Sequence, residues 1–256
     1  MDKEILNMEE AAELFNVSIK TFIKLLKEEK VPARKIGREW RFSRKALVEW
    51  LSSGDSQAYS SSESETKEFF NRVAPEWEDI RRGYYDESVK NKLVEMKLLQ
   101  SGMTVMDLGA GDGYLSRAVA RYVKKVVAVD ISGEMLRELA KKAGAEGISN
   151  IETLESDGCD VPVENASIDL VCASMYLHNI EDPEQAVKEI KRMLKPKGKV
   201  FLADFKEHSN RELKEKLHDV WQGFSTEEVR EWFEKYGFKE IKLESLPGIF
   251  ILTAVK

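Results

Sequence analysis

Cysteine, histidine and proline are scarce in this chain of 256 residues, which contains 2, 3 and 6 of them, respectively. Two cysteines, Cys159 and Cys172, cannot build a disulfide framework or a four-cysteine zinc site. The three scattered histidines have no metal-ligand spacing either. We therefore expect no bound metal and a reducing compartment such as the cytoplasm.

Long hydrophobic runs are also missing. No stretch approaches the roughly 20 apolar residues that span a bilayer, and the first ten residues, MDKEILNMEE, contain no apolar signal core. Secretion and contact with a membrane are therefore not expected. Apolar residues at 42% and charged residues at 34% are instead typical of a globular chain, and its length predicts about one or two domains.

The net charge of -6 hides two parts of opposite sign. Residues 1–54 contain 11 Lys+Arg and 9 Asp+Glu, a net charge of +2, whereas the other 202 residues contain 29 and 37, a net charge of -8. Within residues 19–48 the basic side chains outnumber the acidic ones by 10 to 3. This asymmetry favours a polyanionic partner for the N-terminal part, although a solvated basic helix face gives the same pattern.

Serine dominates one segment of the chain. In residues 52–64, SSGDSQAYSSSES, 7 of the 13 residues are serine, and Ala58 and Tyr59 are the only apolar side chains. Such a segment cannot bury enough surface to offset its ordering entropy. We therefore predict a first domain at residues 1–54, a flexible linker at residues 55–65 and a larger domain at residues 66–256.

The N-terminal part is predicted to begin with two short helices. Asn7 and Glu10 have the spacing of a capping box, and Ser18 can cap a second helix after a tight turn. That second helix is expected to bury the side chains of Ile19, Phe22, Ile23, Leu25 and Leu26 and to present Lys20, Thr21, Lys24 and Lys27 outward. Two short helices joined in this way form a helix-turn-helix.

A hairpin and a last helix follow. Residues 33–36 and 40–42 flank the turn Gly37-Arg38-Glu39, and Ser43 can cap a helix that continues through Leu51. The hairpin can reach backbone phosphates as a wing while the second helix enters a major groove.

Residues 5–51, with the segment LNMEEAAELFNVSIKTFIKLLKEEKVPARKIGREWRFSRKALVEWL, resemble the excisionase-type, MerR-like winged helix-turn-helix family. The resemblance implies binding of duplex DNA, and a homodimer wherever such domains bind paired half-sites. The residues that it places against DNA are Ser18, Lys20, Thr21, Lys24, Arg34, Lys35, Arg38 and Arg41. The alternative is a domain that serves dimerisation or another partner, because Phe22 and Lys24 stand where the family often has arginine.

The larger part alternates apolar strands with helical segments. Strands are expected at residues 103–108, 126–129, 151–154, 168–173 and 199–203, and helices at residues 114–123, 133–143 and 183–194. Residues 238–246 and 249–255 are expected to form a final hairpin across Pro247-Gly248. Strands separated by helices imply a doubly wound, mostly parallel α/β sheet with helices on both faces, to which the hairpin adds an antiparallel strand.

A glycine-rich turn, Gly109-Ala110-Gly111-Asp112-Gly113, follows the first of these strands. Its glycines let the backbone approach a ligand closely and turn into a helix. Asp130 ends the next strand, where a ribose diol would lie in a doubly wound sheet. A nicotinamide enzyme would share that contact, but Asp107 and Asp112 would repel a pyrophosphate. These acids favour a cationic ligand with a sulfonium and an ammonium group, such as S-adenosylmethionine.

Three segments resemble the class I S-adenosylmethionine-dependent methyltransferases, above all the small-molecule branch that includes the ubiquinone/menaquinone C-methyltransferases. They are VMDLGAGDGYLSRAVA, VVAVDISGEML and ESDGCDVPVENASIDLVCASMYLHNIEDPEQAVKEIKRMLKPKGKVFLADF. The resemblance extends from about Phe69 to the C-terminus. It implies a seven-stranded, Rossmann-like domain that binds S-adenosylmethionine and releases S-adenosylhomocysteine. The flanking segments FFNRVAPEWEDIR and LHDVWQGFSTEEVREWFEKYGF look closest to the methyltransferase halves of ArsR-type regulator–methyltransferase fusions.

The resemblance also implies which residues hold the cofactor. Asp107, Gly109, Ala110, Gly111 and Gly113 would meet its methionine end, Asp130 its ribose, Ile131 and Met135 the face of its adenine, and Asp157 and Gly158 the adenine amino group. Ser174 and Met175 would line the methyl-donor side, and Trp77 and Tyr85 would cover the cofactor. Ordinary core packing is the alternative for Ile131 and Met135, and a simple turn is the alternative for Asp157.

His178 follows the fourth strand, where this fold opens toward the substrate, and is the candidate general base for methyl transfer. A hydrogen bond to backbone is its structural alternative. His208 and His218 flank a charged segment at residues 210–220 that is expected to be helical. The expected lining of the substrate pocket is Tyr176, His208, His218, Trp221 and Phe224, although the last two can equally be core residues.

Several acceptor classes are excluded by missing motifs. Residues 174–177, Ser-Met-Tyr-Leu, replace the Asn/Asp-Pro-Pro-aromatic motif of amino-methylating DNA enzymes, and neither Pro162 nor Pro183 precedes the cysteine of a cytosine-ring methylase. Arsenite methyltransferases need more thiolates than two. Two hypotheses remain: a small-molecule methyltransferase with a DNA-binding domain that regulates or localises it, and a transcriptional regulator whose second domain senses the cofactor or a metabolite without turnover.

Overall fold

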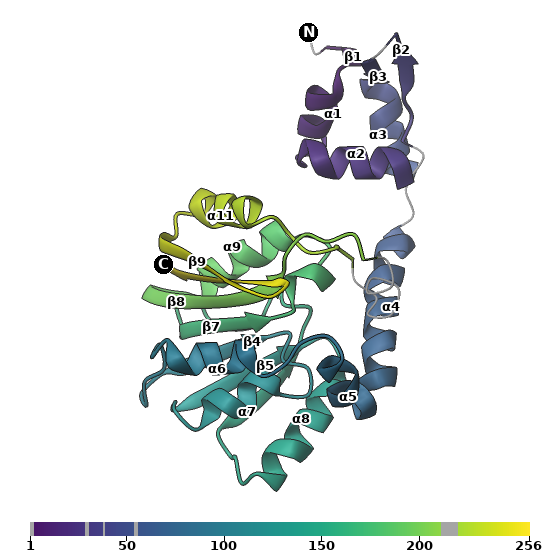
Figure 1. Ribbon diagram of the computed structural model, residues 1–256. Coiled ribbons are helices and arrows are strands. Elements are labelled where there is room, and N and C mark those ends of the chain that lie inside the picture. The colour runs from purple at the N-terminus through teal and green to yellow at the C-terminus, as the bar shows by residue number, and fades with distance from the viewer. Residues whose placement is uncertain (1–2, 29–30, 38, 54–55, 211–219) are drawn as a thin grey trace. The chain divides into compact units, whose positions relative to one another are not determined.

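The computed structural model describes residues 3–28, 31–37, 39–53, 56–210 and 220–256. The chain divides into two compact units, Met1–Ser62 and Glu63–Lys256 (Figure 1). The first unit contains a three-stranded sheet with helices, and the second contains a seven-stranded sheet with helices on both faces. The predicted fold class is therefore confirmed.

The first unit is a small helix-turn-helix domain with a hairpin. Its elements are β1 (Ile5–Leu6), α1 (Met8–Leu14), α2 (Ile19–Glu28), β2 (Arg34–Ile36), β3 (Glu39–Ser43) and α3 (Arg44–Ser53). The strands pair antiparallel in the order β1-β3-β2, so the predicted hairpin is present, together with a short strand β1 that the sequence did not predict. The predicted capping box is also present: Glu10 N donates to Asn7 Oδ1 at 2.8 Å, and Asn7 N donates to Glu10 Oε2 at 2.9 Å.

Helix α2 buries less of its surface than its sequence suggested. Ser18 caps it as predicted, since Thr21 N donates to Ser18 Oγ at 3.0 Å. Phe22 is fully buried against Phe42, with ring centroids 5.1 Å apart. Ile19 and Ile23 are 43% and 36% exposed, so their predicted burial is wrong. The small core needs only an apolar stripe roughly 100° wide, and these two residues lie at the flank of the stripe that Phe22 defines.

The serine-rich segment is helical from Ser56 onward, as the first half of α4 (Ser56–Val73). The flexible linker predicted at residues 55–65 is therefore corrected for residues 56–65, while residue 55 lies outside the described residues. A helix satisfies its hydrogen bonds internally, so a polar segment can extend a helix that is already nucleated. The end of α4 is fixed in the second unit, where Asn71 contacts Ser132 and Lys67 forms an ion pair with Glu155.

Two further helices precede the large sheet and were not predicted. A short 3-10 turn, Ala74–Glu76, leads into α5 (Trp77–Arg82), and α6 (Ser88–Glu95) follows. Val89 and Leu93 of α6 are fully buried against the sheet, whereas Glu87 and Glu95 at its ends are not. These helices are short and mostly polar, which leaves little apolar periodicity for a prediction.

The large sheet has the order β6-β5-β4-β7-β8-β10-β9. Its strands are β4 (Thr104–Leu108), β5 (Lys125–Asp130), β6 (Ile151–Glu155), β7 (Ile168–Ser174), β8 (Leu194–Phe205), β9 (Lys239–Leu246) and β10 (Ile249–Val255). Strands β4 to β8 pair in parallel, and β10 pairs antiparallel with both β8 and β9. The predicted final hairpin thus completes the sheet with two strands, and the carboxyl ends of the five parallel strands share one edge.

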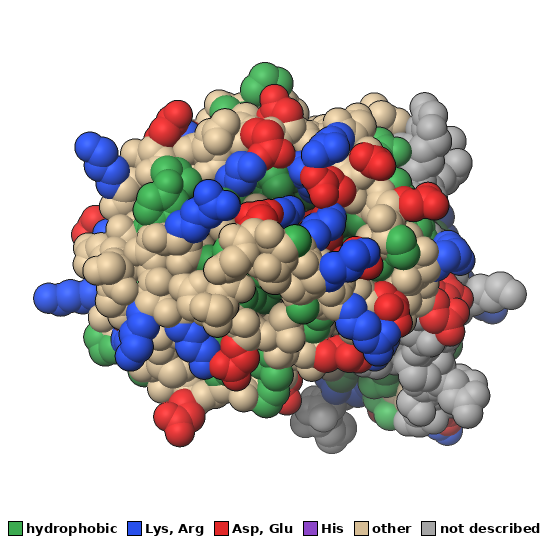
Figure 2. Space-filling model, turned by 90° about the horizontal axis from the view of Figure 1, so that it is seen from below, with side chains coloured by type: hydrophobic (Ala, Val, Ile, Leu, Met, Phe, Trp, Pro, Cys, Tyr) green, Lys and Arg blue, Asp and Glu red, His purple; other side chains and the backbone are tan. Residues whose placement is uncertain are grey.

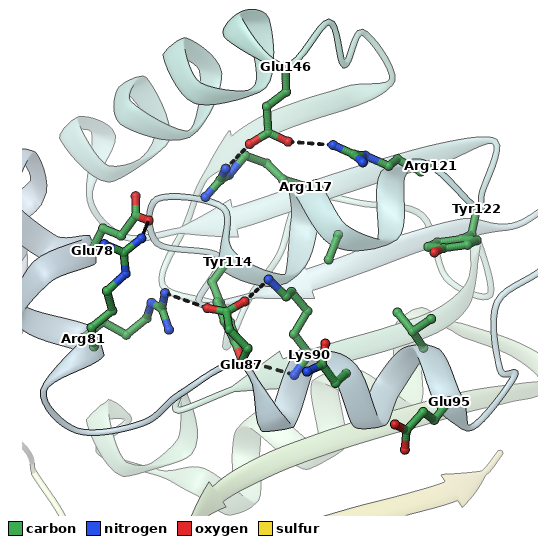
Figure 3. Close-up of a pocket in the computed structure, with 14 residues that line it drawn as sticks. Glu78, Arg81, Glu87, Lys90, Glu95, Tyr114, Arg117, Arg121, Tyr122 and Glu146 are labelled. Carbon is green, nitrogen blue, oxygen red and sulfur yellow. Dashed lines mark hydrogen bonds and ion pairs between the residues drawn. The ribbon is translucent and has the colours of Figure 1, made fainter.

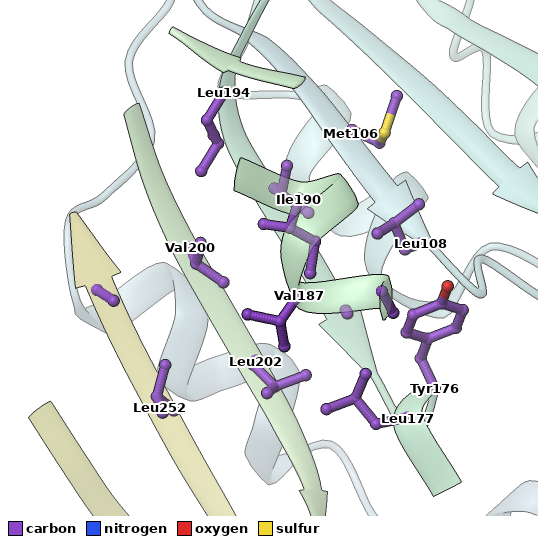
Figure 4. Close-up of a cluster of buried hydrophobic side chains, with 14 of the residues drawn as sticks. Met106, Leu108, Tyr176, Leu177, Val187, Ile190, Leu194, Val200, Leu202 and Leu252 are labelled. Atoms are coloured by element: carbon purple, nitrogen blue, oxygen red, sulfur yellow. The ribbon is translucent and has the colours of Figure 1, made fainter. Parts of the chain in front are cut away.

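Alternating side chains supply a separate core on each face of the sheet. In β4, Val105 points toward α6 and α7 (Tyr114–Ala120), and Met106 and Leu108 point to the opposite face. The first face is also covered by α8 (Gly133–Ala145). The second is covered by α9 (Pro183–Met193) and α11 (Thr226–Lys235), where Leu202 packs with the side chains in Figure 4. This two-sided burial holds the carboxyl edge of the sheet in place.

Candidate cofactor cleft and active site

The glycine-rich turn lies at the carboxyl edge of the sheet, between β4 and α7. Gly109, Gly111 and Gly113 have φ angles of 66°, 52° and 92°, which a side chain would strain. A Cβ on Gly109 would lie 2.8 Å from Tyr176 Cδ2, so the close approach of the Tyr176 ring also requires glycine there. Ala110 N donates to Val129 O at 2.9 Å, which ties the turn to β5.

Asp130 ends β5 beside this turn. Its Oδ2 accepts from Gly111 N at 2.8 Å, and its Oδ1 accepts from Ser132 N at 2.9 Å. Burial raises the pKa of Asp130 to about 6. Because a carboxylate can accept about four hydrogen bonds, the two oxygens retain acceptor capacity for the two hydroxyls of a ribose. Ser132 caps α8 as predicted, and Met135 is buried one turn further on, next to Ile131.

Asp107 and Asp112, the two other acids of this region, both have partners. This corrects the expectation that their charges would repel a pyrophosphate. Asp112 forms an ion pair with Lys142, which in turn pairs with Glu78 at 2.8 Å. Asp107 is buried in β4, its Oδ2 accepts from Ser116 Oγ at 2.6 Å, and burial raises its pKa to about 7. Their combined charge near pH 7 is thus smaller than the sequence indicated, and Asp130 remains the main acid at the turn.

Helices α4 and α5 cover this edge of the sheet. Asn71 Oδ1 accepts from Ser132 Oγ at 2.8 Å, next to Asp130. Trp77 lies over the turn, because a Cβ on Gly111 would be 3.4 Å from Trp77 Nε1, and its ring packs edge-on against Phe70 at 5.4 Å. The sequence singled out Trp77 but missed Asn71, a polar residue in a helix that was not predicted.

Tyr85, farther along the chain than Trp77, lies against the start of α7. Its ring is 5.7 Å from that of Tyr114, and Arg81 stacks on both rings. The structure therefore places Trp77 directly over the glycine-rich turn but Tyr85 beside the first residue of the helix that follows it.

The loop after β6 faces the turn across the Tyr176 ring. Asp157 Oδ1 accepts from Cys159 N at 2.9 Å, which makes a turn with Gly158 at its centre. A Cβ on Gly158 would be 2.2 Å from the Tyr176 hydroxyl. That hydroxyl is buried and has no hydrogen-bond partner among the described residues, and burial raises the pKa of Tyr176 well above its usual range. Tyr176 thus lies between the loops that follow β4 and β6.

Ser174 and Met175 end β7 at the same edge. Ser174 Oγ is buried without a hydrogen-bond partner in the described part of the chain. Met175 has a φ angle of 54°, unusual for a residue with a side chain, and its N donates to Ala203 O at 2.9 Å. Backbone strain of this kind persists where the surroundings fix the chain and often marks a functional site.

His178 is held by a buried acid that the sequence analysis missed. His178 Nδ1 lies 2.7 Å from Asp204 Oδ1, and the two residues are 3% and 0% exposed. Asp204 also accepts from Leu177 N and Phe205 N, both at 2.8 Å. Asn179 Nδ2 lies 3.1 Å from His178 Nε2. The sequence did contain a signal for Asp204, because it is a lone acid in the apolar strand FLADF. An acid is rarely buried in such a strand without a partner.

The segment after β8 returns to His178. Trp221 N donates to His178 O at 3.0 Å, and Phe205 packs between His178 and His208, with ring centroids 5.1 and 5.9 Å away. Burial and then the nearby His178 lower the pKa of His208. Phe224 is a core residue at 2% exposure. His218 and most of the charged segment predicted to be helical, residues 211–219, lie outside the described residues.

The residues predicted to contact DNA lie on α2 and the hairpin. Lys20 is exposed on α2, and Thr21 and Lys24 on the same helix are half-buried. In the hairpin, Arg34 pairs in register with Arg41, and Lys35 pairs with Trp40. Arg38 lies outside the described residues.

Among the described residues no cluster of three His, Cys, Asp or Glu side chains could hold a metal ion. No helix in the described part of the chain is long and apolar enough to cross a bilayer.

The residues at this edge of the sheet suit S-adenosylmethionine. Asp130 offers acceptors for a diol, and Ser174 Oγ is a buried polar atom in need of a partner. The rings of Tyr176 and Trp77 lie against Gly109 and Gly111 of the turn.

Comparison with known proteins agrees with this geometry. Residues 106–202 match the family model of a methyltransferase domain, and residues 5–55 match that of a helix-turn-helix domain. The 2-methyl-6-phytyl-1,4-hydroquinone methyltransferase 1 of Oryza sativa is 27% identical over 171 residues, which are 65% of this chain and 51% of the relative. A ubiquinone/menaquinone biosynthesis C-methyltransferase of Pseudomonas aeruginosa is 28% identical over 161 residues, 60% of this chain and 62% of the relative.

Solved structures show the same fold. A SAM-dependent methyltransferase from Aquifex aeolicus aligns with a TM-score of 0.58 at 23% identity, over 75% of this chain and 97% of the other. The chain spans only 51% and 62% of the two curated relatives named above. The chain therefore joins a region that matches a helix-turn-helix domain to a region that matches a methyltransferase domain, and its second unit has the fold of that solved methyltransferase.

Proposed function

We propose that this protein transfers a methyl group from S-adenosylmethionine to a small-molecule acceptor, and that its N-terminal domain binds duplex DNA. The observation that carries the first part is Asp130, whose carboxylate is fixed by Gly111 N and Ser132 N beside the glycine-rich turn. A carboxylate aimed in this way selects a ligand with a vicinal diol. The printed names of the hydroquinone and quinone methyltransferases support a small organic acceptor.

The chain's own residues would hold the cofactor around the turn. Asp130 accepts from the ribose hydroxyls, and Asp157 and Gly158 meet the adenine edge, with Ile131 and Met135 on its face. Asp107 and the turn from Gly109 through Ala110 to Gly113 border the methionine end. Trp77 covers the turn and excludes water from it, with Tyr85 farther along.

When bound, S-adenosylmethionine supplies an electrophilic methyl group on a sulfonium. The chain contributes mainly positioning, which is worth several kcal/mol for a two-reactant step. Ser174 and Met175 line the donor side, while His208 and Trp221 wall the acceptor side. Tyr176 lies between the loops that hold the cofactor, and Phe224 belongs to the core behind the wall.

His178 would take the acceptor's proton. Asp204 fixes Nδ1 as the protonated ring nitrogen, which leaves the Nε2 lone pair for the base. Asn179 Nδ2 donates to that lone pair at 3.1 Å, so an acceptor's proton must replace the Asn179 amide.

The basic N-terminal unit supports DNA binding. Arg34, Lys35 and Arg41 lie on the hairpin, Ser18 and Lys20 are exposed at the start of α2, and Thr21 and Lys24 of α2 are half-buried. Lys and Arg at these places can displace phosphate counterions. Exposed Ile19 and Ile23 on α2 favour shape and apolar contact over direct base reading, and they also suit a homodimer.

A second candidate is a regulator that binds the cofactor without turnover, because a helix-turn-helix domain shares the chain with the cofactor site.

Calorimetry separates both of these proposals from a dinucleotide-binding enzyme. We expect S-adenosylmethionine and S-adenosylhomocysteine to bind the full chain, and NADH not to bind. Binding without S-adenosylhomocysteine formation in any cell-extract fraction, together with cofactor-dependent DNA affinity, would favour the regulator. Tighter binding of NADH would contradict both.

A further inference from the structure

A polar pocket of about 580 Å³ lies on the outer side of α5, α6 and α7 (Figure 3). A cavity of this size is typical of small-molecule sites. Not one of the residues predicted to hold the cofactor or its acceptor lines it among the described residues. It is therefore a second concave site in the same unit, separate from the cleft at the carboxyl edge of the sheet.

Buried arginine distinguishes this pocket from an ordinary charged surface. Arg81 lines it and is only 3% exposed, with its guanidinium stacked 4.2 Å above the centre of the Tyr114 ring. Its Nε is buried and finds no hydrogen-bond partner in the described structure. Its other hydrogen bonds are long, 3.5 Å to Tyr85 O and 3.4 Å to Glu87 Oε1. A guanidinium has five N–H donors, so Arg81 is left poorly satisfied for so buried a charge.

A second guanidinium and an ammonium line the same pocket. Arg117 Nε is also buried without a partner among the described side chains, although its Nη1 pairs with Glu146. Lys90 pairs with Glu87, and burial and then the positive charges of Arg81 and Arg117 lower the pKa of Lys90. Arg81 and Arg117 therefore act on Lys90, and Glu146 and Glu78 offset part of that effect. A ligand with negative charge would add to this offset.

Glu87 is the group that a ligand must replace. It bridges Arg81 and Lys90, yet its side chain is 46% exposed and can swing into solvent. In Figure 3 it lies between these two side chains, where dashed lines mark both ion pairs. By contrast, the surface seen in Figure 2 carries basic and acidic side chains interspersed, without a large patch of one sign.

We propose that this pocket binds a phosphoryl group, either free or carried by a small molecule. A phosphoryl group carries about -1.5 to -2 charges and three acceptor oxygens near pH 7. One oxygen can meet the guanidinium of Arg81 and another that of Arg117, while the third replaces Glu87 at Lys90. Arginine recognises carboxylates and phosphoryl groups alike through paired N–H donors, but only a phosphoryl group has a third oxygen for Lys90.

Calorimetric titration of the full chain with inorganic phosphate at pH 7.5 and constant ionic strength tests this proposal. We expect saturable binding that Arg117→Gln weakens about tenfold or more, since one charged hydrogen-bonding group is lost. Glu87→Gln should tighten binding, because it removes the competing carboxylate and keeps its shape. The matched control is Arg137→Gln, an exposed arginine of α8 that pairs with Glu134 outside the pocket. It should bind phosphate as the wild type does.

The same titration with saturating S-adenosylhomocysteine separates this site from the cofactor cleft. Unchanged phosphate affinity is expected, whereas competition would assign the phosphate to the cleft and overturn the proposal. Absence of saturable binding, or equal effects of Arg117→Gln and Arg137→Gln, would also overturn it. Because Arg81 is buried, Arg81→Gln can fail to fold, and the variants Arg117→Gln and Glu87→Gln, at half-buried positions, therefore carry the test.

Discussion

Asp130→Asn tests the cofactor cleft with a change of a single atom. The wild-type carboxylate accepts from Gly111 N at 2.8 Å and from Ser132 N at 2.9 Å. An asparagine offers only one oxygen to these two donors, and its amide nitrogen would face the other. One backbone N–H is then left unpaired, which costs about 1–3 kcal/mol of the free energy of unfolding.

Asp130→Asn should weaken the binding of the cofactor by more free energy than it takes from the stability of the fold. Two charge-assisted hydrogen bonds to the ribose hydroxyls disappear or weaken, and together they are worth at least about 1.5–3 kcal/mol. That loss corresponds to a dissociation constant raised roughly 10- to 160-fold. Burial raises the pKa of Asp130 to about 6, so wild-type affinity should also fall as pH drops below about 6 and the carboxylate becomes protonated.

Calorimetry with S-adenosylhomocysteine at pH 7.5 and pH 5.5 measures both effects, with circular dichroism to confirm folding. The matched control is Glu152→Gln, an exposed acid on the neighbouring β6 that pairs with Lys125. We expect the control to bind as the wild type does at both values of pH. Equal affinities of Asp130→Asn and the wild type at pH 7.5 would refute the assignment of Asp130 to the ribose.

Other variants test the proposed base and its partner, the buried acid of β4 and the DNA contact of the hairpin. His178→Ala should slow methyl transfer about a hundredfold or more with cofactor affinity nearly intact. A much smaller loss of rate would make His178 a pocket residue. Asp204→Asn should alter the pH profile of the rate. Burial raises the pKa of Asp107 from 3.8 to about 7, so its protonated form is favoured in the fold and its stability contribution is lost as pH rises from about 4 to 7. Asp107→Asn should therefore reduce that pH-dependent loss in thermal melts of the ligand-free chain, and an unchanged difference between pH 5 and pH 7.5 would contradict the burial argument. The double variant Arg34→Gln/Lys35→Gln in the full chain should weaken DNA binding and lower the slope of log affinity against log salt by about two, and an unchanged slope would remove the hairpin from the DNA contact.

The central strands could be predicted because their signal is local. A continuous apolar run such as residues 168–173 is long enough for a buried parallel strand and too short for most helices. The glycine-rich turn and Asp130 were equally accessible, since backbone conformation and position at a strand end depend on the adjacent sequence. Each of these features lies where it was expected.

Features that depend on distant contacts could not be predicted. Helix α4 extends through a serine-rich segment because its other end is fixed by Asn71 and Lys67, which no local pattern reveals. The partner of His178 lies 26 residues away in β8, at Asp204. Likewise, the charge of Asp112 is offset by Lys142, 30 residues farther along the chain. Pairings of this kind arise only when strands and helices are placed in space.

The most direct test of methyl transfer follows a labelled methyl group. The full chain is incubated with S-adenosylmethionine carrying a radioactive methyl group and with the small-molecule fraction of a cell extract. We predict label in an extracted small molecule, with an equal amount of S-adenosylhomocysteine, and strong loss of both in His178→Ala and Asp130→Asn. Binding of the cofactor with no labelled product from any fraction would contradict catalysis, and label retained in full by both variants would contradict the proposed site.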